Sequence, residues 1–497
     1  MNWRTTIQDL LESSPLRSLF FTRHRWILLS LALLMVAGVS VAGGWLIVEV
    51  GALVMVVLLI AFGYALWAVY DIEVAYLGVF GIITLLPFAS LPFSIGFKPT
   101  FLDLALLGLF VVAALPYLLG EERRFIVTPV GAPVVAFAVM AIGAFVAGLS
   151  HGSLTSYLVR HFAEFLLSIA LFFLVINTVR DFNRLQRLVR WLVVGAWVAS
   201  VIGIVLYLLP DELTMRILST LSRLGYPSGA GVLRYIRDDP SLMQRATSTS
   251  VDPNVLGSLL NVTLAMTIPQ LFARRPFFPR WILVLVLGTM GLCLGLTISR
   301  GSMAGLVCAV LLISVMRYRQ LLPWFGVALV VVLALPWTRE YVQHFMEGIM
   351  IQDLSTQMRM GEYKDAIILI RRYPLLGVGF SGAPDIDLYV AVASIYLLIA
   401  AQMGLLGLSV FLVTMGMLLA RFWRRRHIVR ELADLEPLWY GMHAAIVGGL
   451  VGGLLDHYFF SLDFHHSVTL FWLLVGLAAA TTELVDGARG DGAVESA

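Results

Sequence analysis

The sequence has few charged residues and very little cysteine. Only 13% of its 497 residues are Asp, Glu, Lys or Arg, about half the share found in soluble globular proteins. The two cysteines, Cys293 and Cys308, lie in apolar runs and lack the close spacing of redox or metal-binding pairs. The sequence also lacks the GxxxxGK[ST] loop of ATPases and the HExxH motif of zinc peptidases. These absences exclude a soluble protein, a disulfide-rich domain and an internal ATPase.

In place of charge, the chain carries apolar runs of roughly 20 residues, the length that spans a bilayer as a helix. We therefore predict an all-α polytopic membrane protein with about 14 transmembrane helices. A β-barrel would show alternating apolar and polar residues instead. The predicted spans are 26–43, 49–69, 73–90, 102–119, 130–149, 158–178, 190–209, 254–273, 281–298, 302–316, 321–337, 391–415, 437–456 and 466–484.

The distribution of Lys and Arg predicts the orientation of these spans. With the N-terminus in the cytoplasm, every short cytoplasmic segment is basic, as in "RRPFFPR" and "RFWRRRHIVR". The short external segments carry at most one Lys or Arg, in agreement with the positive-inside rule. We expect a cytoplasmic segment 1–25 without a cleavable signal peptide, a membrane domain 26–484 and a disordered cytoplasmic tail 485–497.

Two of the predicted external loops are long, 210–253 and 338–390. The second contains a predicted amphipathic helix, 357–372, in which apolar residues recur at helical spacing from Tyr363 to Ile370. The proline and glycine residues of "YPLLGVGFSGAPD" end this helix. Such a helix lies on the membrane surface or covers a cavity.

Arginines gather on the predicted external side. Arg245 comes shortly before a span, Arg300 stands at the turn between two spans, and Arg359 lies in the loop helix. Asp252 and Pro253 predict a helix start, as N-cap and first helical residue, close to Arg245. Gathered guanidinium groups suit the oxygens of a phosphate ligand. The alternatives are a snorkelling or salt-bridged Arg300 and an ordinary loop arginine at position 245.

Histidines and carboxylates are found on the same predicted side. The turn "DHYFFSLDFHH" contributes Asp456, His457 and His465, and the long loop contributes Asp385 and Asp387. The spacing matches no signature of a metal site, so we predict no metal ligands here. Either residue type can act as a general base near neutral pH, and Asp456 can orient a histidine. The alternative is a solvated turn.

One charged pair lies inside a predicted span. Arg160 and Glu164 are four residues apart in the span 158–178. Such pairs neutralise each other, and we interpret this one as structural. Ionisable residues within membranes also mark functional sites, so that alternative stays open.

Three stretches resemble the O-antigen ligase and O-antigen polymerase superfamily of bacterial membrane glycosyltransferases. They are "RATSTSVDPNVLGSLL", "TISRGSMAGL" and "RMGEYKDAIILIRRYPLLGVGFSG…IYLLIAAQMGLLGL". Together they cover roughly residues 240–410 in the family's order and at similar spacing. Ser248 stands where the family commonly has glycine.

The resemblance implies a helical membrane fold of the GT-C type in the bacterial cytoplasmic membrane, with both termini cytoplasmic and the active site facing outward. It implies transfer of a glycan from undecaprenyl diphosphate to a glycan or lipid acceptor. No cofactor, catalytic metal, nucleotide or nucleic-acid partner is expected. By position, Arg245 and Arg300 correspond to arginines that hold the lipid diphosphate, and we add Arg359 to this set.

The sequence departs from the family at Ala393 and Ser394, where many members have His-Asn and the histidine is a proposed base. We predict that Asp385, Asp387, His457 or His465 takes this role. The missing histidine favours a polymerase over a ligase. A transporter or flippase for lipid-linked glycans and a non-catalytic assembly partner remain alternatives; a transporter would show matched, interrupted repeats.

Overall fold

The computed structural model describes residues 63–91, 97–120, 125–236, 239–327, 354–382 and 392–494. The chain forms two compact units, Met1–Tyr70 and Asp71–Ala497. Within the first unit, the described residues 63–70 are helical. Everything below concerns the second unit.

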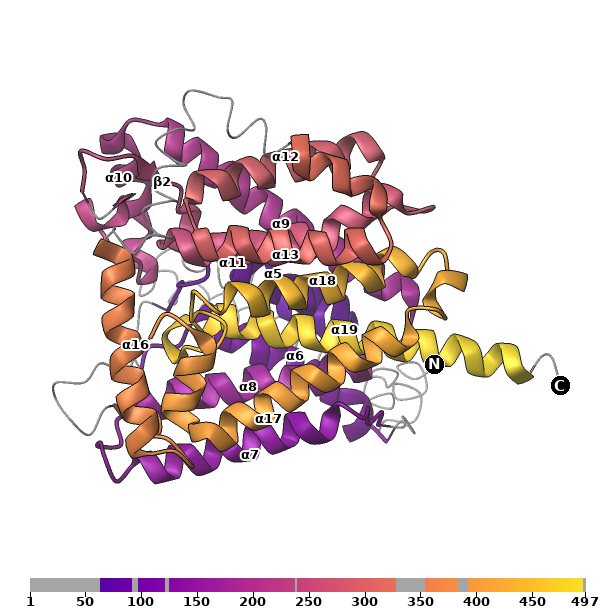
Figure 1. Ribbon diagram of the computed structural model, residues 1–497, viewed down its shortest axis with the longest axis horizontal. Helices are drawn as coiled ribbons and strands as arrows, with labels where there is room; N and C mark the ends of the chain where they lie inside the picture. Colours follow the sequence, from indigo (N-terminus) through magenta and orange to yellow (C-terminus); the bar gives the residue numbers. More distant parts are fainter. Residues whose placement is uncertain are drawn as a thin grey trace, which may run out of the picture. The chain divides into compact units, whose positions relative to one another are not determined.

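The second unit is built almost entirely of helices (Figure 1). A two-stranded antiparallel ribbon pairs β1 (Arg234–Tyr235) with β2 (Gln244–Arg245). The α-helices are α5 (Ile72–Leu85), α6 (Phe101–Leu118), α7 (Gly131–Gly148), α8 (Ser156–Thr178), α9 (Phe182–Leu208), α10 (Asp211–Thr220), α11 (Pro253–Thr267), α12 (Arg280–Thr297), α13 (Arg300–Met316), α16 (Leu354–Arg372), α17 (Ile395–Arg425), α18 (Glu436–Gly452) and α19 (His465–Val494).

Eight helices of the described chain are long and apolar enough to cross a membrane, and α5 and α13 are shorter apolar helices. The protein is therefore a polytopic all-α membrane protein, as the sequence predicts. The predicted spans 26–43, 49–69 and 321–337 lie wholly or largely outside the described residues. The number of spans therefore remains a prediction. Helix α19 continues to Val494, where the sequence predicts a disordered tail from residue 485.

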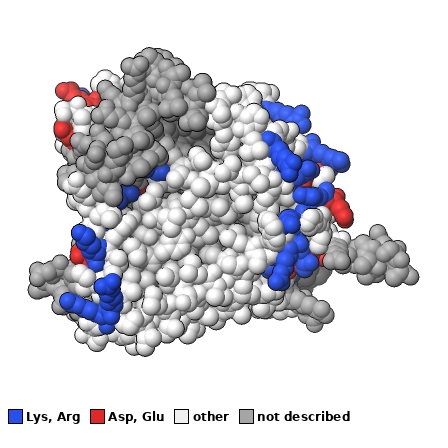
Figure 2. All heavy atoms as spheres, viewed as in Figure 1, with Lys and Arg blue, Asp and Glu red and all other residues white. Residues whose placement is uncertain are grey.

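Successive membrane helices run in opposite directions, which gives the bundle two ends. We call the end where α12 stops and α13 starts the site end, and the other the opposite end. Helix α16 runs across the site end, crosswise to the bundle helices (Figure 1). In the view of Figure 2, charged side chains gather at these two ends, while the broad white surface between them is suited to the hydrocarbon core.

Helices α11 and α19 form the interior of the bundle. In their spans 83% and 89% of the residues are buried, against 22% for α6. Trp439 of α18 and Trp472 of α19 are among the largest fully buried side chains. Mean hydropathy does not decide this difference, because α6 has a higher value than α11, and an apolar helix in a membrane can face lipid as well as protein.

The loop that follows α16 is tied to a kink in α17. Gly404 interrupts α17 with φ of 69°, a conformation that glycine adopts without strain. The backbone N–H groups of Val378 and Gly379 donate to the carbonyls of Ala401 and Gln402 at 2.9 Å, and the N–H of Leu405 donates to Pro374 at 2.7 Å. The "PLLGVG" stretch thus pairs with backbone groups around the kink and anchors the end of α16.

Candidate functional site

Arg300 is the first residue of α13, at the site end of the bundle. Helix α12 ends at Thr297, and Ile298 then adopts a left-handed conformation with φ of 54°. Ser299 is the N-cap of α13. The predicted tight hairpin is thus confirmed. It places the guanidinium at the end of an apolar helix and not in its middle, where burial of a cation would cost more.

Arg245 lies on the other side of the same hairpin. Its Nε donates to the carbonyl of Thr297 at 2.8 Å, and its Nη2 donates to Asn254 Oδ1 at 2.7 Å. The predicted cap of α11 is confirmed, since Asp252 Oδ1 accepts from the backbone N–H groups of Asn254 and Val255. Burial lowers the pKa of the Arg245 guanidinium, and Asp252 opposes this effect. Because an arginine pKa begins so high, the side chain stays charged.

Helix α16 lays one face over this site. Arg300 Nη2 donates to Thr356 Oγ1 at 3.3 Å, and Arg359 Nη2 lies 3.5 Å from Asp456 Oδ1. One turn further, Glu362 Oε2 accepts from the backbone N–H of Ala393 at 3.0 Å. The spacing of three residues keeps these α16 side chains on adjoining parts of one helix face.

The predicted helix 357–372 is confirmed, but part of its packed face differs from the prediction. Ala366 is buried as predicted, whereas Ile367 is 42% exposed and Leu369 takes a buried place. Leu369 packs with Val378 and Ala401. The helix packs against α17. Its buried face is therefore rotated slightly about the helix axis from the face that periodicity alone predicts.

Asp456 is the buried carboxylate among the arginines. Burial raises its pKa to about 7, whereas Arg359, Arg245 and Arg300 act to lower it. Gly301 makes room for this side chain, because a Cβ there would lie 2.5 Å from Asp456 Oδ2. The site thus combines three arginines with a carboxyl group that changes between its neutral and charged forms near neutral pH.

Residues 284–412 match the family model described as O-Antigen ligase. This stretch is similar to the O-antigen ligase family, and we call it the O-antigen ligase domain. The match includes most of α12, all of α13 and α16, and the first part of α17, and therefore Arg300, Arg359 and Glu362. Arg245 and Asp456 lie outside the matched residues, and the tertiary structure brings them next to the matched arginines. No curated protein matches the chain.

Glu362 of the O-antigen ligase domain is a site residue that sequence reasoning missed. Burial raises the pKa of its carboxyl group, while the hydrogen bond from Ala393 and the charge of Arg359 lower it. The neighbouring Tyr363 donates its hydroxyl to the carbonyl of Ala393 at 3.1 Å. The spacing of Arg359 and Glu362 was an available signal, but in a polar loop helix it resembles an ordinary solvated pair.

His457 lies next to Asp456, beyond the matched residues of the O-antigen ligase domain. Its ring stacks on Tyr458, whose hydroxyl donates to Asp252 Oδ1 at 3.2 Å. Burial lowers the pKa of His457 to about 4, so the ring is neutral at physiological pH. A base with so low a pKa accepts a proton weakly.

The other predicted bases are not part of this arrangement. His465 lies at the start of α19 beside Asp103 and Glu164, away from the arginines that contact α16. Asp385 and Asp387 lie outside the described residues. The structure therefore brings together Arg245, Arg300, Arg359, Asp456 and His457, and adds Glu362.

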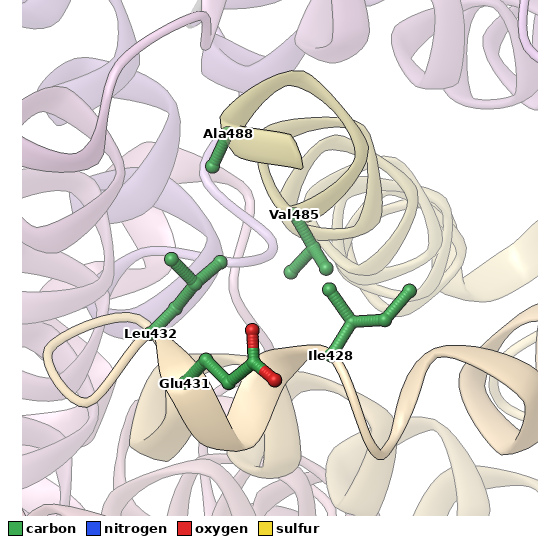
Figure 3. A pocket seen from close by; sticks show the side chains of 5 residues that line it. All are labelled: Ile428, Glu431, Leu432, Val485 and Ala488. Atoms are coloured by element: carbon green, nitrogen blue, oxygen red, sulfur yellow. The ribbon is translucent and has the colours of Figure 1, made fainter. Parts of the chain in front are cut away.

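Two cavities lie elsewhere in the bundle. A cavity of about 330 Å³ at the opposite end is lined by Glu431 and four apolar side chains, and Figure 3 shows the Glu431 carboxylate between Ile428 and Leu432. An apolar groove of about 640 Å³ lies between α6 and α8. Neither is lined by a predicted site residue of the O-antigen ligase domain or its surroundings.

Proposed function

We propose that the protein transfers a glycan from undecaprenyl diphosphate to an acceptor hydroxyl group, as a membrane enzyme of surface polysaccharide assembly. The O-antigen ligase domain supports an enzyme of the ligase or polymerase type that uses lipid-linked glycans. The observation that carries the proposal is the arrangement along α16. Three α16 residues on successive turns each contact one residue of the site. Thr356 contacts Arg300, Arg359 contacts Asp456, and Glu362 contacts Ala393.

The arginines supply the charge that the leaving group requires. When the glycosidic C–O bond breaks, its electron pair goes to the diphosphate oxygen. Arg300 and Arg245 flank one hairpin, and both guanidinium groups can donate to that oxygen and its neighbours. Arg359 contacts Asp456 at 3.5 Å, longer than a typical charged hydrogen bond, and can turn to the diphosphate when it binds.

Glu362 takes the place of the absent histidine as the general base. It contacts Ala393, the position at which the related enzymes carry that histidine, and burial raises its pKa toward the neutral range in which a base works best. In the transfer step, the acceptor O–H proton goes to the Glu362 carboxylate. The acceptor oxygen forms the new bond to the anomeric carbon as the bond to the diphosphate breaks.

The spacing along α16 suits a displacement with the base and the leaving group on opposite sides of the sugar. Thr356, which contacts Arg300, and Glu362 are six residues apart, or about 9 Å along the helix axis. Inverting glycosidases separate their two carboxyl groups by a similar distance. Asp456 acts as a positioning residue that holds Arg359 beside the other arginines until the diphosphate binds.

We further propose that the site end faces outward. At the opposite end, α9, α12 and α17 carry arginines near their ends, including Arg187, Arg280 and Arg425. An excess of basic residues favours the cytoplasmic side of a bacterial membrane. The lipid-linked glycan would then be used on the external face.

The test is glycan transfer by the full chain in lipid nanodiscs, with undecaprenyl-diphosphate-linked glycan as donor and product length as the readout. Glu362→Gln should lower turnover by about 10²–10⁴-fold with donor binding retained, because the base is lost and the clamp stays. Glu362→Asp should restore part of the rate. Lys364→Gln, at an exposed position of the same helix, is the control and should leave the rate unchanged.

The pH profile separates this role from a structural one. Wild-type turnover should fall as the pH drops through the raised pKa of Glu362, because the base must be unprotonated. The Glu362→Gln variant should lose this dependence. Full activity of Glu362→Gln would overturn the base assignment, whereas an inactive wild-type protein would overturn the function itself.

A further inference from the structure

A second polar cluster lies at the site end, built from three helices. Asp103 of α6, Glu164 of α8 and His465 of α19 each direct one ligand atom to a common point, and these atoms lie within 4.8 Å of one another. None of the three is among the arginines and carboxylates assigned to glycan transfer. Glu164 is 3% exposed and His465 is 7% exposed.

Arg160 contacts each carboxylate in the cluster through one of its two oxygens. Asp103 Oδ2 accepts from the backbone N–H of Thr100 at 2.7 Å and lies 3.3 Å from Arg160 Nη2. Glu164 Oε1 accepts from Arg160 Nε at 2.7 Å. These contacts fix both carboxylates and direct their second oxygens toward His465.

The second oxygens and the imidazole are the wrong distance apart for hydrogen bonds. His465 Nδ1 lies 3.5 Å from Glu164 Oε2 and 3.7 Å from Asp103 Oδ1. Among the described residues, neither nitrogen of His465 has a hydrogen-bond partner, and the second oxygens of Asp103 and Glu164 face each other. Glu164 Oε2 also lies 3.2 Å from His161 Nδ1, which is 3.1 Å from the carbonyl of Leu462. Burying unpaired polar atoms is costly, so this arrangement requires an explanation.

The same distances fit ligands around a small cation. A zinc ion bound at 2.0–2.2 Å in tetrahedral geometry keeps its ligand atoms about 3.4 Å apart. That separation is longer than a hydrogen bond and close to the 3.5 Å and 3.7 Å of the cluster. Histidine nitrogens and carboxylate oxygens are both ligands that zinc accepts in proteins.

The charges of the cluster also favour a cation. When Asp103 and Glu164 are both ionised, Arg160 balances only one of the two charges, and with neutral imidazoles one negative charge is left for a cation. Arg160 and Thr100 act on the outer oxygens and orient the ligands, as partners beyond the metal commonly do. A fourth position lies beside His161.

We propose that Asp103, Glu164 and His465 bind a structural zinc ion that joins α6, α8 and α19. The ion ties down the first residue of α19, which directly follows the turn that carries Asp456 and His457. It is separate from the glycan-transfer chemistry and does not depend on the proposed function. Its expected effect is on the stability of the site end.

The test uses the full chain purified in detergent through a tag that needs no metal column. Elemental analysis should find about one zinc per chain, and chelation should lower the thermal midpoint of unfolding, with added zinc restoring it. His465→Gln should weaken zinc binding by at least about tenfold, and added zinc should then leave its midpoint unchanged.

Two further variants keep the proposal falsifiable if His465→Gln folds poorly. Asp103→Asn removes the ligand charge while its side-chain oxygen can still accept from Thr100, and it should also weaken zinc binding. His466→Gln is the matched control, a buried histidine next in the chain, and should bind zinc as the wild type does. A zinc-free wild-type protein whose midpoint does not respond to zinc would overturn the proposal, as would equal zinc affinity in all variants.

Discussion

The arginines that contact α16 hold their charges differently from the arginines at the opposite end of the bundle, whereas elsewhere at the site end Arg160 forms a short pair with Glu164 at 2.7 Å. At the opposite end, carboxylates and arginines form short pairs, including Arg317 with Glu436 at 2.6 Å and Arg421 with Glu483 at 2.7 Å. At the site end, Arg359 lies 3.5 Å from Asp456, and Arg300 donates to a neutral hydroxyl group at 3.3 Å. In a short ion pair, the arginine donates strong hydrogen bonds to its carboxylate partner and is held there. The longer contact of Arg359 with Asp456 is easier to exchange for an anionic ligand.

The site end itself contains two clusters of different composition. Three arginines gather around Asp456, and two carboxylates gather around His465. The first offers several guanidinium donors and suits a diphosphate, whereas the second offers carboxylate oxygens and an imidazole and suits a cation. The kind of group that each cluster offers thus separates the two candidate roles, although both clusters lie at the same end of the helices.

The largest effect is expected from the site-end arginines. Arg300→Ala should lower glycan transfer by about 10²–10³-fold, because it removes donors to the leaving diphosphate. Turnover with lipid-linked donor is the measurement, and Arg371→Ala, an exposed arginine of α16, is the control. Equal rates in both variants would show that Arg300 matters no more for transfer than an exposed arginine of α16.

A smaller loss should follow from Gly301→Ala. The added methyl group would contact Asp456 Oδ2 and displace the carboxylate from Arg359. We expect about tenfold slower transfer with an unchanged fold, since misplacement of a positioning group by a fraction of an ångström costs less than its removal. Gly416→Ala, where a methyl group meets open space, serves as the comparison. An unaffected Gly301→Ala enzyme would separate Asp456 from the transfer step.

The pH dependence of stability should report the charge of Asp456. Because burial raises its pKa to about 7 in the folded protein, its ionisation opposes folding. Its contribution to stability is full below pH of about 4 and is lost as the pH rises to about 7. The thermal midpoint of Asp456→Asn relative to wild type should therefore increase over this range and stay constant above it. A difference that does not vary with pH would contradict the raised pKa.

The smallest effect on transfer is expected at the opposite end. Glu436→Gln breaks the pair with Arg317, whose side chain is 42% exposed, and should destabilise the protein by about 1–2 kcal/mol. Transfer per folded molecule should not change. Unfolding in detergent and turnover, measured on the same preparation, separate the two effects. A large loss of turnover here would show that short ion pairs also serve the reaction.

Local sequence signals predicted the parts of the site that depend on neighbouring residues. The Asp252 cap, the hairpin before Arg300 and the α16 helix follow from capping, turn and periodicity rules that act over a few residues. The predicted base did not follow from such rules. Glu362 meets Ala393 across 31 positions of the chain, and no local pattern records that contact.

By itself, the sequence determined that this is a polytopic helical membrane protein with arginines close to helix ends, because hydrophobic length and capping are properties of short segments. The tertiary structure decided which polar groups meet. His465 contacts Glu164 and Asp103 instead of the arginines, because α19 packs beside α8 and α6 at its first turn. Asp456 meets Arg359 because α16 crosses the site end. Such encounters depend on how helix faces pack, which the periodicity of a single helix leaves open.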